Sequence, residues 1–419
     1  MAEIKPDIET FAKIKVVGVG GAGGNAVSRM IDSKIKGVEF VVINTDAQAL
    51  HNSKAAEKVH IGKNLTKGLG AGMNPEIGRQ AAEENRDEIQ EVLKGADMVF
   101  VACGLGGGTG SGAAPIVAET AKELGALTIG IVTKPFTFEG AQRRAIGEEA
   151  LSNLRDRVDS LITVPNDKLL SIIDKKTSLI NAFRIVDDVL RQGVQGISDL
   201  ITKPGIVNVD FADVRTIMED SGSALMGIGI ASGENRAEEA ARAAINSPLL
   251  ELSIDGAKGV LINISGSADL GMLEINEAAN IITESIDPNA KVIFGAVVDD
   301  QVHKGEIQIT VVATGFDAGR VKERNPVGFV SRVASVPPVP APVSRATVNP
   351  KPATLPEEEE DIFSRSAFES TRRMVESPAM IIEEKIQPAP TPLRAESKDF
   401  ADEGDDLEIP AFIRRKMKK

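Results

Sequence analysis

A glycine-rich stretch that follows a short apolar run, within residues 97–115, limits the possible folds most strongly. Residues 97–103 predict a buried strand, and the apolar spacing from Ala113 to Leu124 predicts a helix. Between them, glycine occupies positions 106, 107, 108, 110 and 112. Glycine lets backbone N–H groups approach a ligand without obstruction by Cβ, and a helix N-terminus adds partial positive charge. The stretch therefore predicts a phosphate-binding loop, because a merely flexible loop has no reason to lie between two buried elements.

A second glycine-rich turn lies near the N-terminus. Residues 12–20 predict a strand, and a helix is expected after the turn, to about Ser33. Gly18, Gly20 and Gly23 fit the dinucleotide-binding spacing G-x-G-x-x-G in the required strand–turn–helix setting, which alone suggests an NAD-binding enzyme. A dinucleotide fold needs one such turn. Two glycine-rich turns after two strands of one sheet can instead close on a single polyphosphate.

The later loop differs from the common phosphate-binding loop, because it contains no lysine. Thr109 and Ser111 supply hydroxyls, so phosphate charge must be balanced by backbone dipoles, a distant arginine or a metal ion. After a second predicted strand, residues 38–43, Asp46 has two possible roles. It either meets a ribose or caps the helix that Ala47 begins.

Strands and helices alternate along the first half of the chain, which predicts an α/β fold with a doubly wound parallel sheet and ligands at the carboxyl ends of its strands. From Gly205 the spacing predicts a smaller α/β domain. The expected organisation is a flexible N-terminus (1–11), a nucleotide-binding domain (12–177), a long connecting helix (178–203), a C-terminal domain with short strands and helices (204–317), a disordered linker (318–403) and a docking tail (404–419).

Composition narrows the class of protein. A net charge of −13 and a pI near 5.0 argue against a general nucleic-acid binder, and a single cysteine excludes a disulfide framework. The prolines of residues 336–343 and the acidic run 357–361 predict the linker, since they cannot bury enough apolar surface to offset chain entropy. Residues 406–416 place a short apolar core between acids and bases, which indicates a docking peptide.

Several motifs together resemble the tubulin/FtsZ family of GTPases. The resemblance runs from about Ile14 to Phe316 and returns at the C-terminal tip; the linker does not share it. The motifs are GVGGAGGNAV at 18–27, NTDAQAL at 44–50, GLGAGMNPEIGR at 68–79, GGGTGSGAAP at 106–115, TKPFTFEG at 133–140, VPNDKLL at 164–170, NVDFADVRTIM at 208–218 and DLEIPAFIRRK at 406–416. Ser111 stands where the family more often has threonine, a change that keeps the hydroxyl.

The resemblance implies GTP as substrate, with Mg²⁺, and a GTP-binding first domain. It implies that Glu139 and Arg143 meet the ribose and phosphates, although alone they would be an ordinary i,i+4 surface pair. It also implies that Phe183 stacks on the base and that Asp187 accepts hydrogen bonds from the N–H groups of the base. Without the resemblance, the two residues would be interpreted as a core phenylalanine and a solvated aspartate. The implied nucleotide-binding residues are Gly21, Ala22, Gly23, Gly24, Asn25, Gly108, Thr109, Gly110, Glu139, Arg143 and Asp187, and no residue is assigned to a metal.

A third group, Asn208, Asp210 and Asp213, opens the smaller domain. Asp210 alone is interpreted as a helix N-cap with an acid in the first turn behind it. The resemblance implies that this loop is catalytic and completes the nucleotide site of the neighbouring subunit. Carboxylates at i and i+3 face one side of a helix and can orient a water molecule and cations against a γ-phosphate.

The function implied is a cytoplasmic, cytoskeletal GTPase that polymerises head-to-tail and forms the division ring at mid-cell. Its expected partners are itself and membrane-tethering or regulatory division proteins, with no nucleic acid and only an indirect link to the membrane. Two alternatives remain: a dinucleotide-dependent oxidoreductase, supported only by residues 18–23, and a nucleotide-binding scaffold that does not hydrolyse, which Asp210 and Asp213 argue against. The residues expected to bind partners are Leu407, Ile409, Pro410, Phe412 and Ile413.

Overall fold

The computed structural model describes residues 12–170, 177–203, 205–247, 250, 253–299 and 302–316, all within one compact unit. The predictions made for residues 1–11, 318–403 and 404–419 lie outside these described residues. So do the expected docking residues Leu407, Ile409, Pro410, Phe412 and Ile413.

Six parallel strands form the first part of the sheet, in the order β3-β2-β1-β4-β5-β6. The central strands are short runs of mostly β-branched residues that are buried almost throughout, as expected for a parallel sheet covered on both faces. The strands are β1 Ile14–Val19, β2 Val38–Asn44, β3 Glu57–His60, β4 Met98–Gly104, β5 Leu127–Lys134 and β6 Ser160–Pro165.

Helices cover both faces of this sheet. Val16 and Val17 are neighbours on β1 but lie in different core clusters, because successive side chains of a strand point to opposite faces. Residues of α1 and α9 pack in the first cluster, and residues of α5, α6 and α7 pack in the second. The helices before α9 are α1 Gly20–Asp32, α2 Ala47–Asn52, α3 Lys63–Thr66, α4 Pro75–Glu84, α5 Arg86–Leu93, α6 Gly108–Glu123, the 3₁₀ helix η1 Thr137–Glu139, α7 Ala141–Arg155 and α8 Asn166–Leu169.

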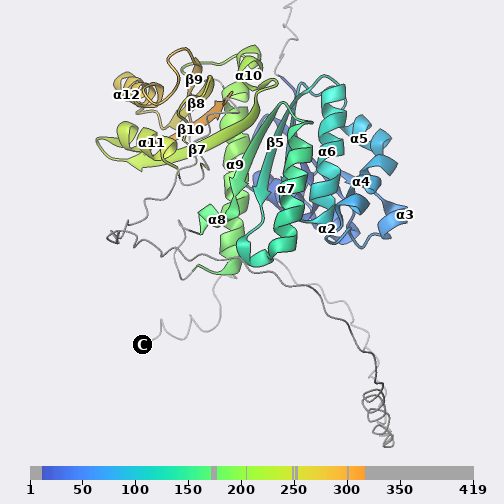
Figure 1. Ribbon diagram of the computed structural model, residues 1–419. Helices are drawn as coiled ribbons and strands as arrows, with labels where there is room; N and C mark the ends of the chain where they lie inside the picture. Colours follow the sequence, from blue (N-terminus) through green and yellow to red (C-terminus); the bar gives the residue numbers. More distant parts are fainter. Residues whose placement is uncertain are drawn as a thin grey trace, which may run out of the picture. The chain divides into compact units, whose positions relative to one another are not determined.

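The long helix α9, Leu179–Thr202, connects the two halves of the fold (Figure 1). Its 24 residues span about 36 Å at 1.5 Å per residue. The hydroxyl of Ser178 accepts a hydrogen bond from the N–H of Asn181 and so caps the helix. In Figure 1, α8 lies beside one end of α9 and α10 lies at the other end.

The C-terminal part continues the sheet in the order β7-β10-β8-β9. Strand β10 is antiparallel to β7 and β8, whereas β8 and β9 are parallel. A short parallel pairing between Ser160–Ile162 of β6 and Gly222–Ala224 of β7 joins the two parts. The elements are α10 Phe211–Met218, β7 Gly222–Ser232, α11 Arg236–Ile245, β8 Gly259–Gly266, α12 Met272–Thr283, β9 Lys291–Val298 and β10 Glu306–Thr314.

The structure confirms the predicted α/β fold, with its parallel sheet and its smaller C-terminal α/β part. The boundaries at 12–177, 178–203 and 204–317 stay predictions. One local expectation, on where two helices begin, was wrong. Helices α1 and α6 begin inside the glycine-rich stretches, at Gly20 and Gly108, although glycine is a poor helix former, because tertiary packing requires glycine there.

Candidate nucleotide site

The two glycine-rich segments touch each other at the carboxyl ends of β1 and β4. Gly20 has a left-handed backbone (φ +73°), and a Cβ placed on it would lie 2.9 Å from the backbone N of Gly110. A Cβ on Gly23 would lie 2.2 Å from the carbonyl oxygen of Ala102 on β4. The close approach of α1 to α6 and to the sheet therefore depends on the absence of side chains at these positions.

A cavity of about 300 Å³ opens where the N-terminal ends of α1 and α6 come together. Cβ atoms on Gly21 or Gly107, which both line the cavity, would meet nothing within 4 Å. The first backbone N–H groups of a helix lack partners within the helix and carry partial positive charge. Two such helix ends at one cavity form an anion-binding site.

The two hydroxyls of the later loop have different surroundings. Thr109 lines the cavity, and its Oγ1 lies 2.7 Å from Oγ1 of the buried Thr45. The hydroxyl of Ser111 instead accepts a hydrogen bond from the N–H of Gly106 at 2.9 Å and so shapes the loop. Asp46 caps α2, since its Oδ1 accepts from the N–H groups of Gln48 and Ala49.

The structure gathers most of the predicted nucleotide-binding residues around this cavity. Gly23 and Gly24 are instead buried in packing contacts with β4 and β2, and Asn25 is exposed but is not among the lining residues. The predicted residues that line the cavity are Gly21, Ala22, Gly108, Thr109, Gly110, Glu139, Arg143 and Asp187.

Glu139 and Arg143 form an ion pair at one wall of the cavity, with 2.5 Å between Oε2 and Nη1. The expectation that they share one helical face was wrong. Glu139 ends η1 and Arg143 lies in α7, and Gly140 between them has φ +100°, which breaks the helical path. The pair is held together by the turn and not by helical spacing.

Helix α9 also lines the cavity and contributes Phe183 and Asp187. The interpretation as a core phenylalanine and a solvated aspartate was wrong, because Phe183 is 40% exposed whereas Asp187 is only 9% exposed. Nε of Arg29, on α1, donates to Oδ2 of Asp187 at 2.7 Å. Burial raises the pKa of Asp187, and the hydrogen bond and charge of Arg29 oppose this rise. A buried carboxylate that faces a cavity is suited to accept N–H groups from a ligand.

Sequence reasoning missed Asn166 as a site residue. Its side chain is 5% exposed and lines the cavity, and its Oδ1 has no hydrogen-bond partner among the described residues. A buried amide oxygen without a partner is costly unless a ligand or water satisfies it. The position just after β6, at the carboxyl end of a strand of the sheet, is the signal that could have identified it.

The predicted catalytic loop lies between α9 and α10. Oδ1 of Asn208 accepts from the N–H of Gly205 at 2.7 Å, and Asp210 caps α10 by accepting from the N–H of Ala212. Asp213 lies in the first turn of α10. All three predicted residues are exposed, so the structure brings them together on the surface.

This loop is far from the cavity of its own chain. Arg215 of α10 donates to the carbonyl oxygen of Gly125, just beyond the C-terminal end of α6, whereas the N-terminal end of α6 lines the cavity. The 16 residues of α6 span about 24 Å. Asp210 and Asp213 therefore cannot contact a ligand in the cavity that the same chain forms.

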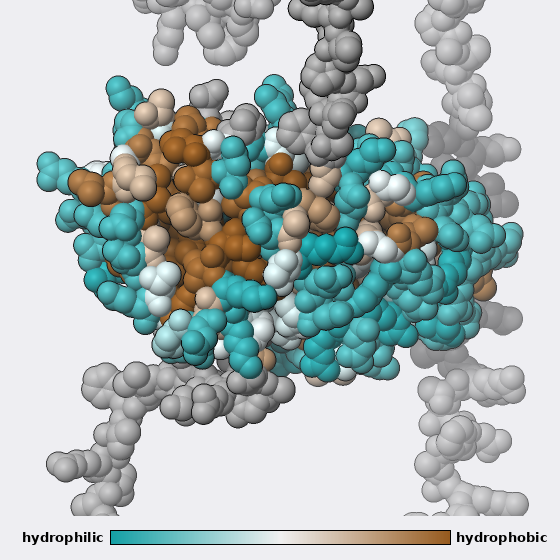
Figure 2. All heavy atoms as spheres, turned by 90° about the horizontal axis from the view of Figure 1, so that it is seen from above, coloured by the Kyte–Doolittle hydropathy of each residue, from teal (hydrophilic) through white to brown (hydrophobic). Residues whose placement is uncertain are grey.

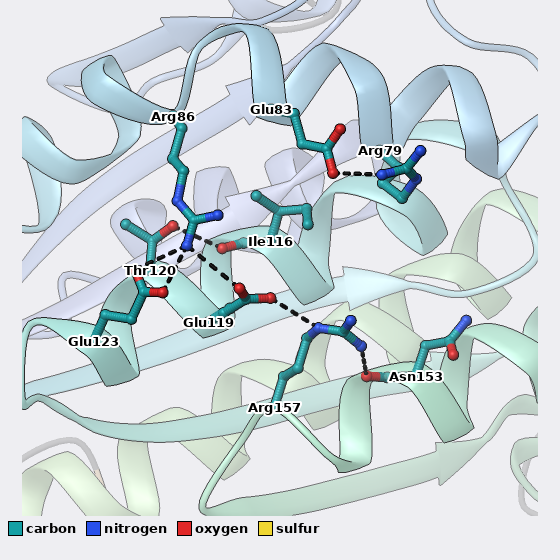
Figure 3. Close-up of polar contacts among 9 residues, drawn as sticks. All are labelled: Arg79, Glu83, Arg86, Ile116, Glu119, Thr120, Glu123, Asn153 and Arg157. Carbon is teal, nitrogen blue, oxygen red and sulfur yellow. Dashed lines mark hydrogen bonds and ion pairs between the residues drawn. The ribbon is translucent and has the colours of Figure 1, made fainter.

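A second groove, of about 410 Å³, lies on the other side of α6, between α4 and α7. Its arginines already have acidic partners. Arg79 pairs with Glu76, and Figure 3 shows its second pair, with Glu83, and the pair between Arg157 and Glu119. The arginine charge of this groove is therefore already neutralised by neighbouring carboxylates, so neither arginine is free to bind a phosphate.

At a phosphate site, Mg²⁺ takes most of its ligands from phosphates and water. Within the residues that the structure describes, no group of three or more His, Cys, Asp or Glu side chains is placed to hold a metal ion. Mg²⁺ at phosphate sites usually keeps several waters and is bound through substrate phosphates plus one or two protein groups. The hydroxyl of Thr109 lines the cavity and is compatible with such a role.

Comparison with known proteins agrees with this site. Residues 13–174 match the model of the Tubulin/FtsZ family GTPase domain, and residues 222–317 match the FtsZ family C-terminal domain. An empty FtsZ dimer from M. jannaschii is 47% identical over 73% of this chain and 89% of that chain, with a TM-score of 0.71. A mutant of FtsZ from M. jannaschii gives the same identity and TM-score over 92% of its length. CetZ2 from Haloferax volcanii, at 22% identity and a TM-score of 0.63 over 74% of this chain and 95% of that chain, shares the fold.

The fold and the site thus define a GTPase of the tubulin/FtsZ class. Within that class, the chain belongs to the FtsZ family. The assignment supports GTP as the ligand and a cytoskeletal, cell-division GTPase as the kind of protein, and it disfavours the dinucleotide-dependent oxidoreductase.

Proposed function

We propose that this chain assembles head-to-tail into filaments and hydrolyses GTP at the contact between subunits, where Asn208, Asp210 and Asp213 of one subunit complete the nucleotide site of the next. The observation that carries the proposal is the separation of the two half-sites by the length of α6. A contact that joins two different surfaces without closing a ring generates a filament.

Exposed apolar side chains at both ends support this contact. Near the cavity, Leu69 is 85% exposed and Phe138 is 61% exposed. At the other end, Ile206 and Phe294 are exposed beside the catalytic loop, where the N–H of Ile206 donates to the carbonyl oxygen of Ala296 on β9. Seen from that end, apolar side chains gather over the C-terminal part of the molecule (Figure 2). Two apolar surfaces gain free energy when they cover each other.

In this mechanism, different residues have different roles in phosphoryl transfer to water. The helix ends at Gly21 and at Gly108–Gly110 hold the phosphates, and Asp187 with Asn166 holds the base. Mg²⁺, held by the phosphates and the Thr109 hydroxyl, would neutralise phosphate charge. Asp210 and Asp213 of the neighbour orient the attacking water against the γ-phosphate, because this reaction depends mainly on positioning and on charge stabilisation.

The concentration dependence of turnover tests the shared site. We expect GTP turnover per molecule to rise steeply with protein concentration and to level off once filaments predominate, as followed by phosphate release and light scattering. Dilute monomeric protein that hydrolyses GTP at the same rate per molecule as concentrated protein would show that one chain holds a complete site.

Asp187 should determine the choice of base. Guanine presents a ring N–H and an exocyclic NH₂ to one carboxylate, whereas adenine has no matching ring donor. We expect GTP to bind far more tightly than ATP, and Asp187→Ala to weaken GTP binding at least tenfold, as measured by nucleotide titration. Asp188→Ala, which changes the neighbouring half-exposed aspartate of α9, is the control and should bind GTP normally. If ATP competed as well as GTP for the site, Asp187 would not determine the choice of base.

We further propose that the chain acts in the cytoplasm at the mid-cell division site and docks division proteins through its C-terminal tail. In the described part of the chain, no helix combines the length and apolarity needed to cross a bilayer. Leu407, Ile409, Pro410, Phe412 and Ile413 form the apolar core of the tail, and basic residues follow it. These features suit a peptide that docks on a membrane-bound partner.

Deletion of residues 404–419 should separate docking from assembly. GTPase activity and filaments are expected to remain, whereas recruitment to a membrane-bound partner should be lost, because the linker that the sequence predicts at 318–403 would separate the tail from the assembly contacts. Co-sedimentation with partner-loaded vesicles measures recruitment, and light scattering measures assembly. Loss of filaments would place the tail in the assembly contact instead.

A further inference from the structure

The C-terminal end of α6 holds the helix that carries Asp213. Within α10, Nη2 of Arg215 donates to the carbonyl oxygen of Gly125 at 3.1 Å. Just after α10, Oδ1 of Asp220 lies 2.8 Å from Nζ of Lys122, which is in the last turn of α6. Both contacts place a cation of one element against an oxygen of the other, so α10 is fastened to α6 from within the helix and from the residue that follows it.

Lys122 also reaches the junction between the two parts of the sheet. Its Nζ lies 2.8 Å from Oδ1 of the buried Asp159, whose Oδ2 accepts from the N–H of Thr128. The carbonyl oxygen of Asp159 accepts from the N–H of Gly222 at 3.0 Å, where β7 begins beside β6. Asp220 has a left-handed backbone (φ +46°), and the hydrogen bond from Lys122 lowers the pKa of its carboxyl.

Helix α6 itself is held firmly along its length. A Cβ on Gly112 would lie 1.9 Å from the carbonyl oxygen of Pro75, so α4 packs directly against the backbone of α6. Further along, Glu119 pairs with both Arg86 of α5 and Arg157, which follows α7 (Figure 3). A helix fixed on several sides acts as a rigid spacer between its two ends.

We propose that Lys122, Arg215 and Asp220 are positioning residues for GTP hydrolysis, because they hold α10 on α6 in the orientation that presents Asp210 and Asp213 to the neighbour's nucleotide. None of the three lines the nucleotide cavity, so they act through α10 and not on the bound nucleotide. The proposal rests on the proposed function, since it assigns the contacts to the half-site that a subunit donates.

Asp220→Asn is the cleanest test variant. Asparagine tolerates a left-handed backbone, and the Asp220 side chain is 78% exposed, so the fold should be kept. The matched control is Asp32→Asn, which removes an exposed carboxylate from its ion pair with Lys54, a pair that involves neither α6 nor α10. A second variant, Arg215→Ala, removes the contact with Gly125, and the double variant removes both contacts. Affinity of the monomer for GTP should stay within about twofold of wild type in all of them, because the cavity is unchanged.

Mixed filaments isolate the donated half-site. In filaments of excess Asp213→Ala protein, a trace subunit contributes its own α10 to a neighbour's GTP, while its own GTP faces an inactive loop. Turnover per trace subunit therefore reports only on the donated α10. We expect roughly 2- to 5-fold lower turnover with Asp220→Asn than with wild type, the size of effect that one exposed ion pair can exert on an equilibrium. The double variant should fall roughly tenfold, and Asp32→Asn should match wild type.

Two outcomes would overturn the inference, and they differ. If trace wild type is active and trace Asp220→Asn and the double variant equal it, the contacts do not position α10, although the shared site stands. If trace wild type adds no turnover to Asp213→Ala filaments, the shared site itself is wrong, and the inference fails with it.

Discussion

Replacing Asp213 by alanine should lower GTP turnover about 100-fold or more while GTP binding and filament formation persist. The first effect follows because removing one group that positions the nucleophile or stabilises charge in the transition state commonly costs this much. The second follows because Asp213 lies about the length of α6 away from the cavity in its own chain. Phosphate release measures turnover, and light scattering should show filaments that outlast those of the wild-type protein.

The control for Asp213→Ala must remove an acid that occupies an equivalent position in another helix. Asp213 is an exposed acid in the first turn of α10, where it also stabilises the helix dipole by about 0.3–1 kcal/mol. Glu239 has the same kind of position in the first turn of α11. Glu239→Ala should keep normal turnover. If Asp213→Ala hydrolyses GTP normally in filaments, α10 has no catalytic role; if it fails to bind GTP, the two half-sites are not separate.

Two glycines of the first turn should respond in opposite ways to alanine. A methyl group on Gly21 enters the cavity without touching any protein atom within 4 Å, so the fold should be kept and GTP affinity should fall at least tenfold. A methyl group on Gly23 would lie 2.2 Å from the carbonyl oxygen of Ala102. Because the atom it would meet belongs to the backbone, which cannot move aside without cost, Gly23→Ala should lower the free energy of unfolding by about 1–3 kcal/mol or more.

Thermal denaturation with and without GTP distinguishes the two effects. Gly21→Ala should melt like the wild-type protein without nucleotide but gain less from added GTP, whereas Gly23→Ala should melt at lower temperature in both conditions. Ser28→Ala, two turns further along α1 and outside the cavity, serves as control. Normal stabilisation of Gly21→Ala by GTP would show that the phosphates do not lie against this turn.

Much of the fold could be predicted from sequence, because the relevant signals are local. Short apolar runs bounded by glycine give the strands, and 3.6-residue spacing gives the longer helices. The start of α1 and α6 could not be predicted, since glycine opposes helix formation locally and is retained for contacts such as that between Gly20 and Gly110, which join distant parts of the chain. The four-residue strand β3 was missed for a similar reason: it is short and is defined by its pairing with β2.

In the candidate site, too, local features could be predicted from the sequence, whereas contacts between distant residues could not. The composition of the glycine-rich turns predicted a phosphate site, and the position of Asp210 predicted a helix cap. The ion pair between Arg29 and Asp187 joins residues 158 positions apart, and the burial of Asp187 depends on how α1 and α9 pack. Neither can be read from periodicity. For the same reason, sequence spacing suggested a helical pair for Glu139 and Arg143, whereas the turn at Gly140 brings them together.

The way α9 joins the two parts of the sheet has a consequence for unfolding. The core cluster around α9 contains Ile131 and Ile162 of the first part together with Met226, Leu261 and Val312 of the second. Neither part can therefore lose its structure without exposing apolar surface of the other, and the short strand pairing between β6 and β7 adds to this linkage. Although the family models recognise two segments, the described chain should melt as one cooperative unit and not as two domains in sequence.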